Sequence, residues 1–134
     1  MAEGLSVSLP LRVDPTDGAY GLNKTLTQMA AQNLRMIILT APGERVMSPS
    51  YGVGVRHYLF EQNSPGTISG LRNRISKQIS TYLPYIQVMN LEVASPTIPG
   101  AGPGASDNTR INISIRYRVP SANIVSDLTI PVTI

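Results

Sequence analysis

Few side chains of this 134-residue chain could do chemistry. It has one histidine, His57, and no cysteine. Disulfide frameworks, zinc–thiolate sites, iron–sulfur clusters, thiol nucleophiles and multi-histidine metal sites are therefore excluded. Arg56 and Tyr58 flank His57, and no serine or aspartate stands at an informative spacing from it. We expect a half-exposed turn residue, not a catalytic base, and we expect no metal and no cofactor.

The composition favours a protein that works through its surface. Charged residues make up only 14% of the chain, against about a quarter in typical soluble proteins, while hydrophobic residues make up 42%. The eleven glycines and eleven prolines indicate many turns and loops. The length fits one domain, 1–134. A surface this poor in charge indicates a subunit that buries part of it against partners.

The basic balance does not indicate nucleic-acid binding. The net charge is +3, but the arginines are spread along the whole chain, whereas nucleic-acid binders concentrate them on one face. We expect the tightest cluster, Arg72, Arg74 and Lys77, to lie on the solvated side of a helix. No signal peptide is visible, and the longest apolar run, residues 36–39, is too short to span a membrane. We expect a soluble product, made in a cytoplasm, with no membrane partner.

The first part of the chain reads as an arm followed by helices. Apolar residues alternate over 5–13, which predicts an extended arm or edge strand within residues 1–21. Residues 22–83 form a helical part. In it, apolar spacing predicts one helix over 22–40, with Asn23 or Thr25 as its cap, and another that begins at Ser64-Pro65 and stops before Pro84. Between the two helices, 41–61 is a loop that contains a short helical turn over 55–60.

The rest of the chain, 84–134, reads as a sheet. Two-residue periodicity predicts strands over 85–94, 110–119 and 124–134, and residues 95–108 form a flexible loop rich in Pro, Gly and Ser. The fold class is therefore α+β. We expect two main helices and a short helical turn packed on a small, three-stranded, mainly antiparallel sheet, with an extended N-terminal arm.

A long ordered motif carries a family resemblance. Residues 39–55, Leu-Thr-Ala-Pro-Gly-Glu-Arg-Val-Met-Ser-Pro-Ser-Tyr-Gly-Val-Gly-Val, are followed by Leu59-Phe60-Glu61. This pattern, with the Leu-Pro-Leu-Arg-Val-Asp of residues 9–14 upstream, resembles the baseplate wedge and sheath-initiator family of contractile phage tails, which tailocins and type VI secretion systems share. The resemblance covers nearly the whole chain. The loop 95–108 departs from the family pattern, being longer and richer in Gly and Pro.

The resemblance implies a partner interface in the motif loop. It implies that Glu44 and Arg45 hold the loop in place and contact neighbouring baseplate subunits; the alternative is a solvated ion pair of little energetic value. For Tyr51-Gly52 and Leu59-Phe60 we favour plain packing of the loop onto the two helices. The predicted interface residues are Glu44, Arg45, Pro49, Tyr51, Gly52, Leu59 and Phe60.

The last strand predicts a second interface. Residues 128–134 carry no charge, Pro131 interrupts a ladder on one side, and the strand ends with the chain, so we expect an uncovered sheet edge. Such an edge is a template for strand addition by another chain. The resemblance implies that the added strand comes from the first sheath ring. The residues named for this role are Leu128, Ile130, Val132 and Ile134; an ordinary final strand is the alternative.

Together these features predict a structural subunit and not an enzyme. The resemblance implies a place in the tail baseplate of a virion assembled in the host cytoplasm, six copies or a multiple, and wedge subunits, sheath protein, and tube or hub proteins as partners. Because some members carry a tail-lysozyme label, a peptidoglycan-degrading enzyme is an alternative. That chemistry needs two facing carboxylates, and the motif region offers only Glu44 and Glu61. A stress-response adaptor of the same fold is a third reading.

Overall fold

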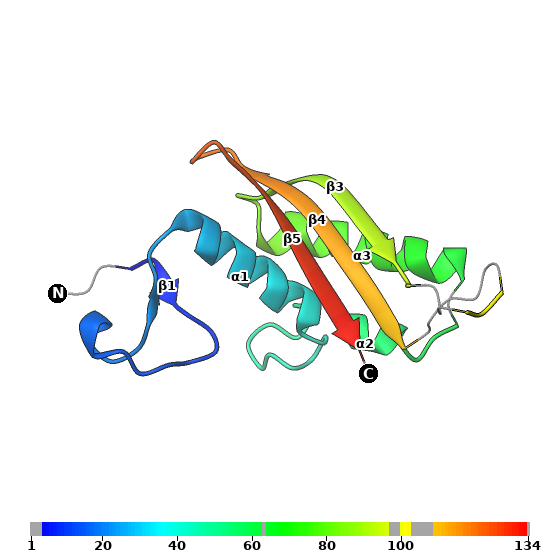
Figure 1. Ribbon diagram of the computed structural model, residues 1–134, viewed down its shortest axis with the longest axis horizontal. Helices are drawn as coiled ribbons and strands as arrows, with labels where there is room; N and C mark the ends of the chain where they lie inside the picture. The colour runs from blue at the N-terminus through cyan, green and yellow to red at the C-terminus, as the bar shows by residue number, and fades with distance from the viewer. Residues whose placement is uncertain (1–3, 63, 97–99, 103–108, 134) are drawn as a thin grey trace.

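The computed structural model describes residues 4–62, 64–96, 100–102 and 109–133. Its helices and strands follow one another as a small two-stranded sheet, three helices and a three-stranded antiparallel sheet (Figure 1). The predicted α+β class is confirmed. Of the predicted loop 95–108, residues 97–99 and 103–108 lie outside the described residues.

The start of the first helix differs from the prediction. Leu22–Asn23 (β2) does not open the helix but pairs with Ser6–Val7 (β1) in an antiparallel ladder. The buried side chain of Asn23 explains this, because its amide Nδ2 donates to Ser6 Oγ at 3.0 Å and to Gln32 Oε1 at 2.9 Å. Because these two hydrogen bonds hold the Asn23 side chain between the arm and the side of the following helix, Asn23 does not belong to the first turn of that helix.

The arm is thus a short hairpin and not a free extended segment. A 3₁₀ turn, Pro15–Asp17 (η1), lies between its two strands, and the carboxylate of Asp17 pairs with Lys24 Nζ at 2.7 Å. The apolar side chains that alternate along the arm remain largely exposed; they are Leu5, Val7, Leu9, Leu11 and Val13. The alternation predicted the extended backbone, but it did not predict burial, because the hairpin meets the following helix mainly through polar contacts of Asn23 and Gln32.

Caps set the ends of both long helices. Leu26–Leu39 (α1) begins after Thr25, whose hydroxyl accepts from the backbone N–H of Gln28 while the Gln28 side chain accepts from the backbone of Thr25. Pro65–Tyr82 (α3) begins after the Ser64 cap, as predicted, and ends before Pro84. Between them lies the one-turn helix Val55–Tyr58 (α2).

Gln87–Ala94 (β3), Arg110–Val119 (β4) and Ile124–Thr133 (β5) form the sheet in the order β3-β4-β5. The pairing of β4 with β5 is regular along its whole length, whereas β3 carries a bulge between Val88 and Asn90. Odd-numbered residues of β4 are buried, and most of the even-numbered ones, including three arginines, are exposed. The predicted strand over 110–119 is therefore present, and it is half-buried with a basic outer face.

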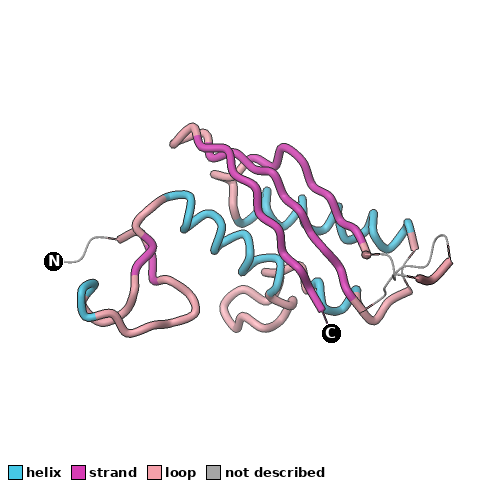
Figure 2. The backbone as a smooth tube through the Cα atoms, viewed as in Figure 1, coloured by secondary structure: helices cyan, strands magenta, loops and turns pink. Residues whose placement is uncertain are grey.

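All three helices cover one face of this sheet, and the other face is open to solvent (Figures 1 and 2). The buried side chains of the helices, the strands and the motif loop (residues 41–61) form one contiguous cluster. Its largest members include Leu34, Ile75, Ile113 and Tyr117. Among the described residues, no helix is both long and apolar enough to cross a membrane.

Candidate partner interfaces

Two side chains of α3 clamp the middle of the motif loop, residues 41–61. Arg74 donates from Nε to the carbonyl of Val53 at 3.0 Å and from a terminal nitrogen to the carbonyl of Gly52 at 3.3 Å. Gln78, one turn later, accepts from Gly52 N–H at 3.0 Å and donates to the carbonyl of Ser50 at 3.1 Å. The prediction that Arg74 is solvated was therefore wrong, because its guanidinium satisfies carbonyls of a loop that comes from far away in sequence.

Tyr82 continues the same row by another turn. Its hydroxyl lies 2.8 Å from Ser50 Oγ, and its ring meets the ring of Tyr51 edge to face at 5.0 Å between centroids. The guanidinium of Arg45 lies 3.9 Å above the centroid of Tyr51. Burial raises the pKa of Tyr51, and the positive charge of Arg45 opposes part of that shift. Tyr51 thus anchors the loop in the core, and the guanidinium of Arg45 covers its ring.

Gly52 can only be glycine. Its φ is +109°, and a Cβ would overlap the carbonyl oxygen of Thr40 at the end of α1. The two residues that follow Gly52 also bond to this end of α1: Val53 N–H donates to the carbonyl of Ile37 at 2.9 Å, and Gly54 N–H donates to that of Thr40 at 2.9 Å. The motif loop therefore packs its backbone directly on α1, which explains why the motif carries glycine here.

Glu44 closes the first turn of the motif loop. Its Oε2 accepts from the backbone N–H of Ala41 at 3.0 Å, and its own N–H donates to the carbonyl of Ala41 at 3.1 Å. Gly43 N–H donates to the carbonyl of Pro49 at 2.8 Å, which joins the two ends of the turn. The part of the prediction in which Glu44 and Arg45 hold the loop agrees with this geometry, and both side chains, with Pro49, are also exposed.

The tip of the loop presents two side chains that the sequence analysis did not single out. Val46 is 93% and Met47 94% exposed. They lie between the Glu44 turn and Pro49, in a segment with neither helical nor strand periodicity, so no pattern drew attention to them. Two apolar side chains held outward by a hydrogen-bonded turn are suited to insertion into a partner.

Leu59 and Phe60 differ in burial. Leu59 is 5% exposed and belongs to the core, whereas Phe60 is 77% exposed. The packing of Tyr51, Gly52 and Leu59 agrees with the reading that the motif loop is plugged onto the helices. Phe60 does not, because the one-turn α2 ends before it and turns its ring to solvent.

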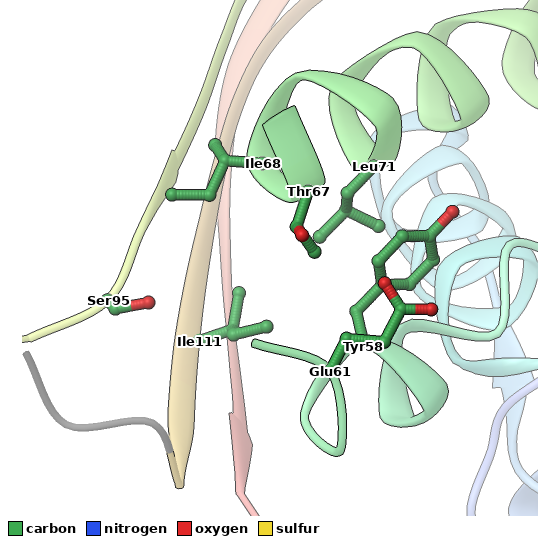
Figure 3. A pocket seen from close by; sticks show the side chains of 7 residues that line it. All are labelled: Tyr58, Glu61, Thr67, Ile68, Leu71, Ser95 and Ile111. Carbon is green, nitrogen blue, oxygen red and sulfur yellow. The ribbon is translucent and has the colours of Figure 1, made fainter. Parts of the chain in front are cut away.

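The two carboxylates of the motif region, Glu44 and Glu61, do not line the same described cavity. Glu61 lines a cavity of about 10 Å³ beside Tyr58 and Leu71 (Figure 3), and Glu44 does not contribute to that cavity. A volume of this size holds about one water molecule. A wider hollow of about 300 Å³ on the outer sheet face includes Glu92 and Asp127, but Asp127 is paired with Arg116 at 3.4 Å.

His57 is exposed on α2. In the part of the chain that the structure describes, no three His, Cys, Asp or Glu side chains group as metal ligands.

Three of the four residues named for strand addition are core residues. Leu128, Ile130 and Val132 point to the helices and are buried, and Ile134 lies outside the described residues. Their side chains therefore hold β5 in its own domain. The backbone of the outer edge is different, because within the described ranges β5 is the last strand of its sheet and bonds to β4 on one side only.

Pro131 shows which backbone groups face that edge. It lies opposite Asn112 of β4, and a proline in a sheet turns its nitrogen away from the neighbouring strand because it has no N–H to donate. Backbone polar groups alternate between the two sides of a strand. The N–H and C=O groups on the outer edge therefore belong to alternate residues, which are Val125, Asp127, Thr129 and Thr133, with only the C=O of Pro131.

Comparison with known proteins identifies the family. The model of a family described as baseplate wedge protein gp25 matches residues 24–123, which include α1, the motif loop, α3 and most of the sheet. This chain belongs to the baseplate wedge family. Its role is therefore that of a structural protein of contractile-tail baseplates. Among curated proteins, none matches the chain.

Solved structures agree with the baseplate wedge fold. A protein of Geobacter sulfurreducens that carries the name tail lysozyme is 26% identical, with a TM-score of 0.67 over 84% of this chain and 95% of that one. A chain in the baseplate of the anti-feeding prophage is also 26% identical, with a TM-score of 0.67 over 88% of this chain and 85% of that one. A chain of the pyocin R2 baseplate after contraction, 18% identical with a TM-score of 0.51, covers 92% of this chain and 98% of its own length and shares the fold.

Proposed function

We propose that this baseplate wedge protein acts as a single-domain structural subunit with two working surfaces. The motif loop joins it to other wedge components near the tube, and the outer edge of β5 receives a strand from the first sheath ring. Six copies or a multiple, tube or hub contacts, and assembly in the host cytoplasm belong to the same proposal, as do the absence of nucleic-acid and membrane partners.

The observation that carries the proposal is the outer edge of β5. Proteins usually protect such an edge with charged side chains, a proline, a bulge or a covering segment, and β5 has two of these devices, the charge of Asp127 and the single proline Pro131. The last residues of β5 are uncharged, the pairing with β4 contains no bulge, and no strand is paired to its other side among the described residues. Main-chain donors and acceptors in a row are what an added strand binds.

The sharpest test removes one of these donors and leaves the core intact. Thr129 is exposed, and its N–H faces away from β4, so Thr129→Pro deletes an edge donor without removing a bond to β4. The matched control, Thr129→Ala, keeps the N–H. Deleting residues 128–134 is unsuitable because it removes three buried core side chains and would unfold the domain.

We expect Thr129→Pro particles to have baseplates and tubes but little sheath by electron microscopy, while Thr129→Ala particles are normal. Circular dichroism and thermal unfolding of each purified variant check that it is folded. Normal sheath on folded Thr129→Pro baseplates would contradict strand addition at this edge.

The motif loop interface has its own test. Val46→Ser and Met47→Ser remove only exposed apolar surface, so they should leave the free energy of unfolding unchanged within about 0.5 kcal/mol. We expect them to reduce co-purification with the other wedge subunits, whereas Met89→Ser on β3, which also removes an exposed apolar side chain, has no effect. Recovery of tail subunits with the wild-type chain also separates a wedge protein from a stress-response adaptor.

The name of the Geobacter sulfurreducens relative keeps peptidoglycan cleavage as a second candidate. The separation of Glu44 from the small Glu61 cavity argues against it. A peptidoglycan-clearing assay on the wild type, Glu44→Gln and Glu61→Gln decides the matter. We expect no clearing by any of them; clearing that either glutamine variant abolishes would establish an enzyme.

A further inference from the structure

A recess lies where the end of β5 meets α2. It has a volume of about 310 Å³ and is lined by Arg56, Leu59, Phe60 and Thr133. It is more than an order of magnitude larger than the cavity beside Glu61, and it is open to solvent at the surface of the molecule. A space of this size can take a whole aromatic or large aliphatic side chain.

Hydrogen bonds of the turn that follows α2 hold Phe60 in place beside the recess. The backbone N–H of Phe60 donates to the carbonyl of His57 at 3.2 Å, and that of Leu59 donates to Arg56 at 3.3 Å. Leu59 anchors the turn in the core while Phe60 stands 77% exposed. Phe60 is the only phenylalanine of the chain. An aromatic ring held outward at a recess is typical of the residues that dominate binding at an interface.

The recess is continuous with the edge of β5. Thr133 lines it, and the backbone of Thr133 faces the same outer edge as that of Val125, Asp127 and Thr129. A strand that pairs along this edge therefore arrives at the recess at one of its ends. In strand addition the main chain supplies affinity, and pockets for individual side chains supply specificity.

We propose that this recess, which we call the Phe60 recess, receives one large apolar side chain of the strand that adds to β5. The inference rests on the proposed function and specifies the partner: its strand carries an aliphatic or aromatic residue at the position that reaches Thr133. The exposed Arg56 at the recess disfavours lysine or arginine there, since like charges repel.

The test measures binding of the purified sheath subunit of the same particle, kept monomeric, to the full chain. Three variants are compared with the wild type: Phe60→Ala in the recess, Thr129→Pro at the edge and Met89→Ala as an exposed apolar control on β3. We expect Phe60→Ala to weaken binding about tenfold, as loss of an interface anchor does, Thr129→Pro to abolish it, and Met89→Ala to change it by less than about twofold.

The outcomes separate the two ideas. Unchanged binding by Phe60→Ala together with loss of binding by Thr129→Pro overturns the Phe60 recess and leaves strand addition standing. Unchanged binding by Thr129→Pro overturns strand addition itself. Because Phe60 is exposed, Phe60→Ala should fold normally, and thermal unfolding confirms this. A photo-crosslinking analogue at position 60, followed by mass spectrometry, should mark an apolar residue of the sheath strand; crosslinks to a charged segment contradict the inference.

Discussion

The two outer strands of the sheet, β3 and β5, differ in how regular their unpaired edges are. β3 is eight residues long and carries a bulge between Val88 and Asn90. β5 is ten residues long and pairs regularly with β4 along its whole length. Bulges twist an edge and disrupt its row of hydrogen-bonding groups. One outer strand of the sheet thus carries a bulge while the other pairs regularly, and this difference is the reason why β5 is the edge proposed to receive a partner strand.

The largest expected effect is on the free energy of unfolding, and it compares how much core packing stabilises β5 and β3. Ile130 of β5 is 3% exposed, whereas Leu91 of β3 is only partly buried. Ile130→Ala should lower the free energy of unfolding by about 2–4 kcal/mol, and Leu91→Ala by about 1–2 kcal/mol, because the cost follows the buried volume that is lost. Urea denaturation followed by circular dichroism measures both. Equal losses would mean that β5 is anchored no better than β3.

The second prediction removes the protection of β3. Met89 is the extra residue at the bulge and is exposed, and without it the alternation of side chains from Val88 to Leu91 is regular. We expect the chain lacking Met89 to fold with a straight β3 and to self-associate, because a regular edge favours edge-to-edge pairing. Sedimentation velocity over a concentration series checks this. Met89→Ala keeps the bulge and should remain as the wild type; a monomeric deletion variant would show that the bulge is not what protects this edge.

The third prediction uses Tyr117, in the strand that both edges share. Burial raises the pKa of Tyr117, and a hydrogen bond with Ser126 of β5 opposes the shift. A raised pKa means that the folded state holds the phenolic proton more tightly. Its contribution to stability is therefore full below about pH 10, the usual tyrosine value, and declines as the pH rises through the higher folded pKa. Urea denaturation at a series of alkaline pH values should show a decline that Tyr117→Phe reduces.

The two edges should affect this titration in opposite directions. Ser126→Ala, on the β5 side, removes the opposing hydrogen bond and should raise the pKa of Tyr117 further. Val88→Ala, opposite Tyr117 on β3, lets water approach and should lower it. Tyrosinate absorbance against pH, with Tyr117→Phe as the reference, measures both shifts. Shifts of the same sign would contradict the assignment.

The smallest expected effect concerns the acidic residues of the outer face. Asp127 of β5 pairs with Arg116 across the ladder at 3.4 Å, whereas Glu92 of β3 accepts from Asn90 of its own strand at 3.1 Å. Both groups of the ion pair are exposed, so Asp127→Asn should cost less than about 0.5 kcal/mol. Thermal unfolding at low and high salt measures the loss, and a large loss would mean that charge, and not packing, fixes β5 to β4.

The sequence predicted the elements whose burial is periodic. The two-residue pattern of 110–119 and the three-to-four-residue pattern of α3 each describe one side that faces the core, so the pattern and the structure agree. Residues 22–23 were assigned to a helix because Leu22 fits the apolar stripe, while the buried amide of Asn23 leaves no periodic trace.

The candidate interfaces were harder to predict because they depend on contacts distant in sequence. Arg74, Gln78 and Tyr82 recur at four-residue spacing, which a search for polar rows on α3 could have found. Their partners are visible only once the chain is folded: Arg74 and Gln78 bind the backbone of residues 50–53, and Tyr82 contacts the side chains of Ser50 and Tyr51. The exposure of Phe60 likewise follows from the end of α2, since sequence alone does not distinguish it from the buried Leu59 beside it.

Pro131 has a consequence for alignment. A uniform strand edge repeats every two residues, so a strand laid against it can slide by one repeat with little change in bonding. The missing N–H at Pro131 breaks that repeat at one known place, and a strand that shifts along β5 brings a different acceptor to the gap. In the proposed strand addition, Pro131 therefore sets the register of the added strand. If the copies of this chain stand in a ring, Pro131 gives every added strand the same register on its own subunit.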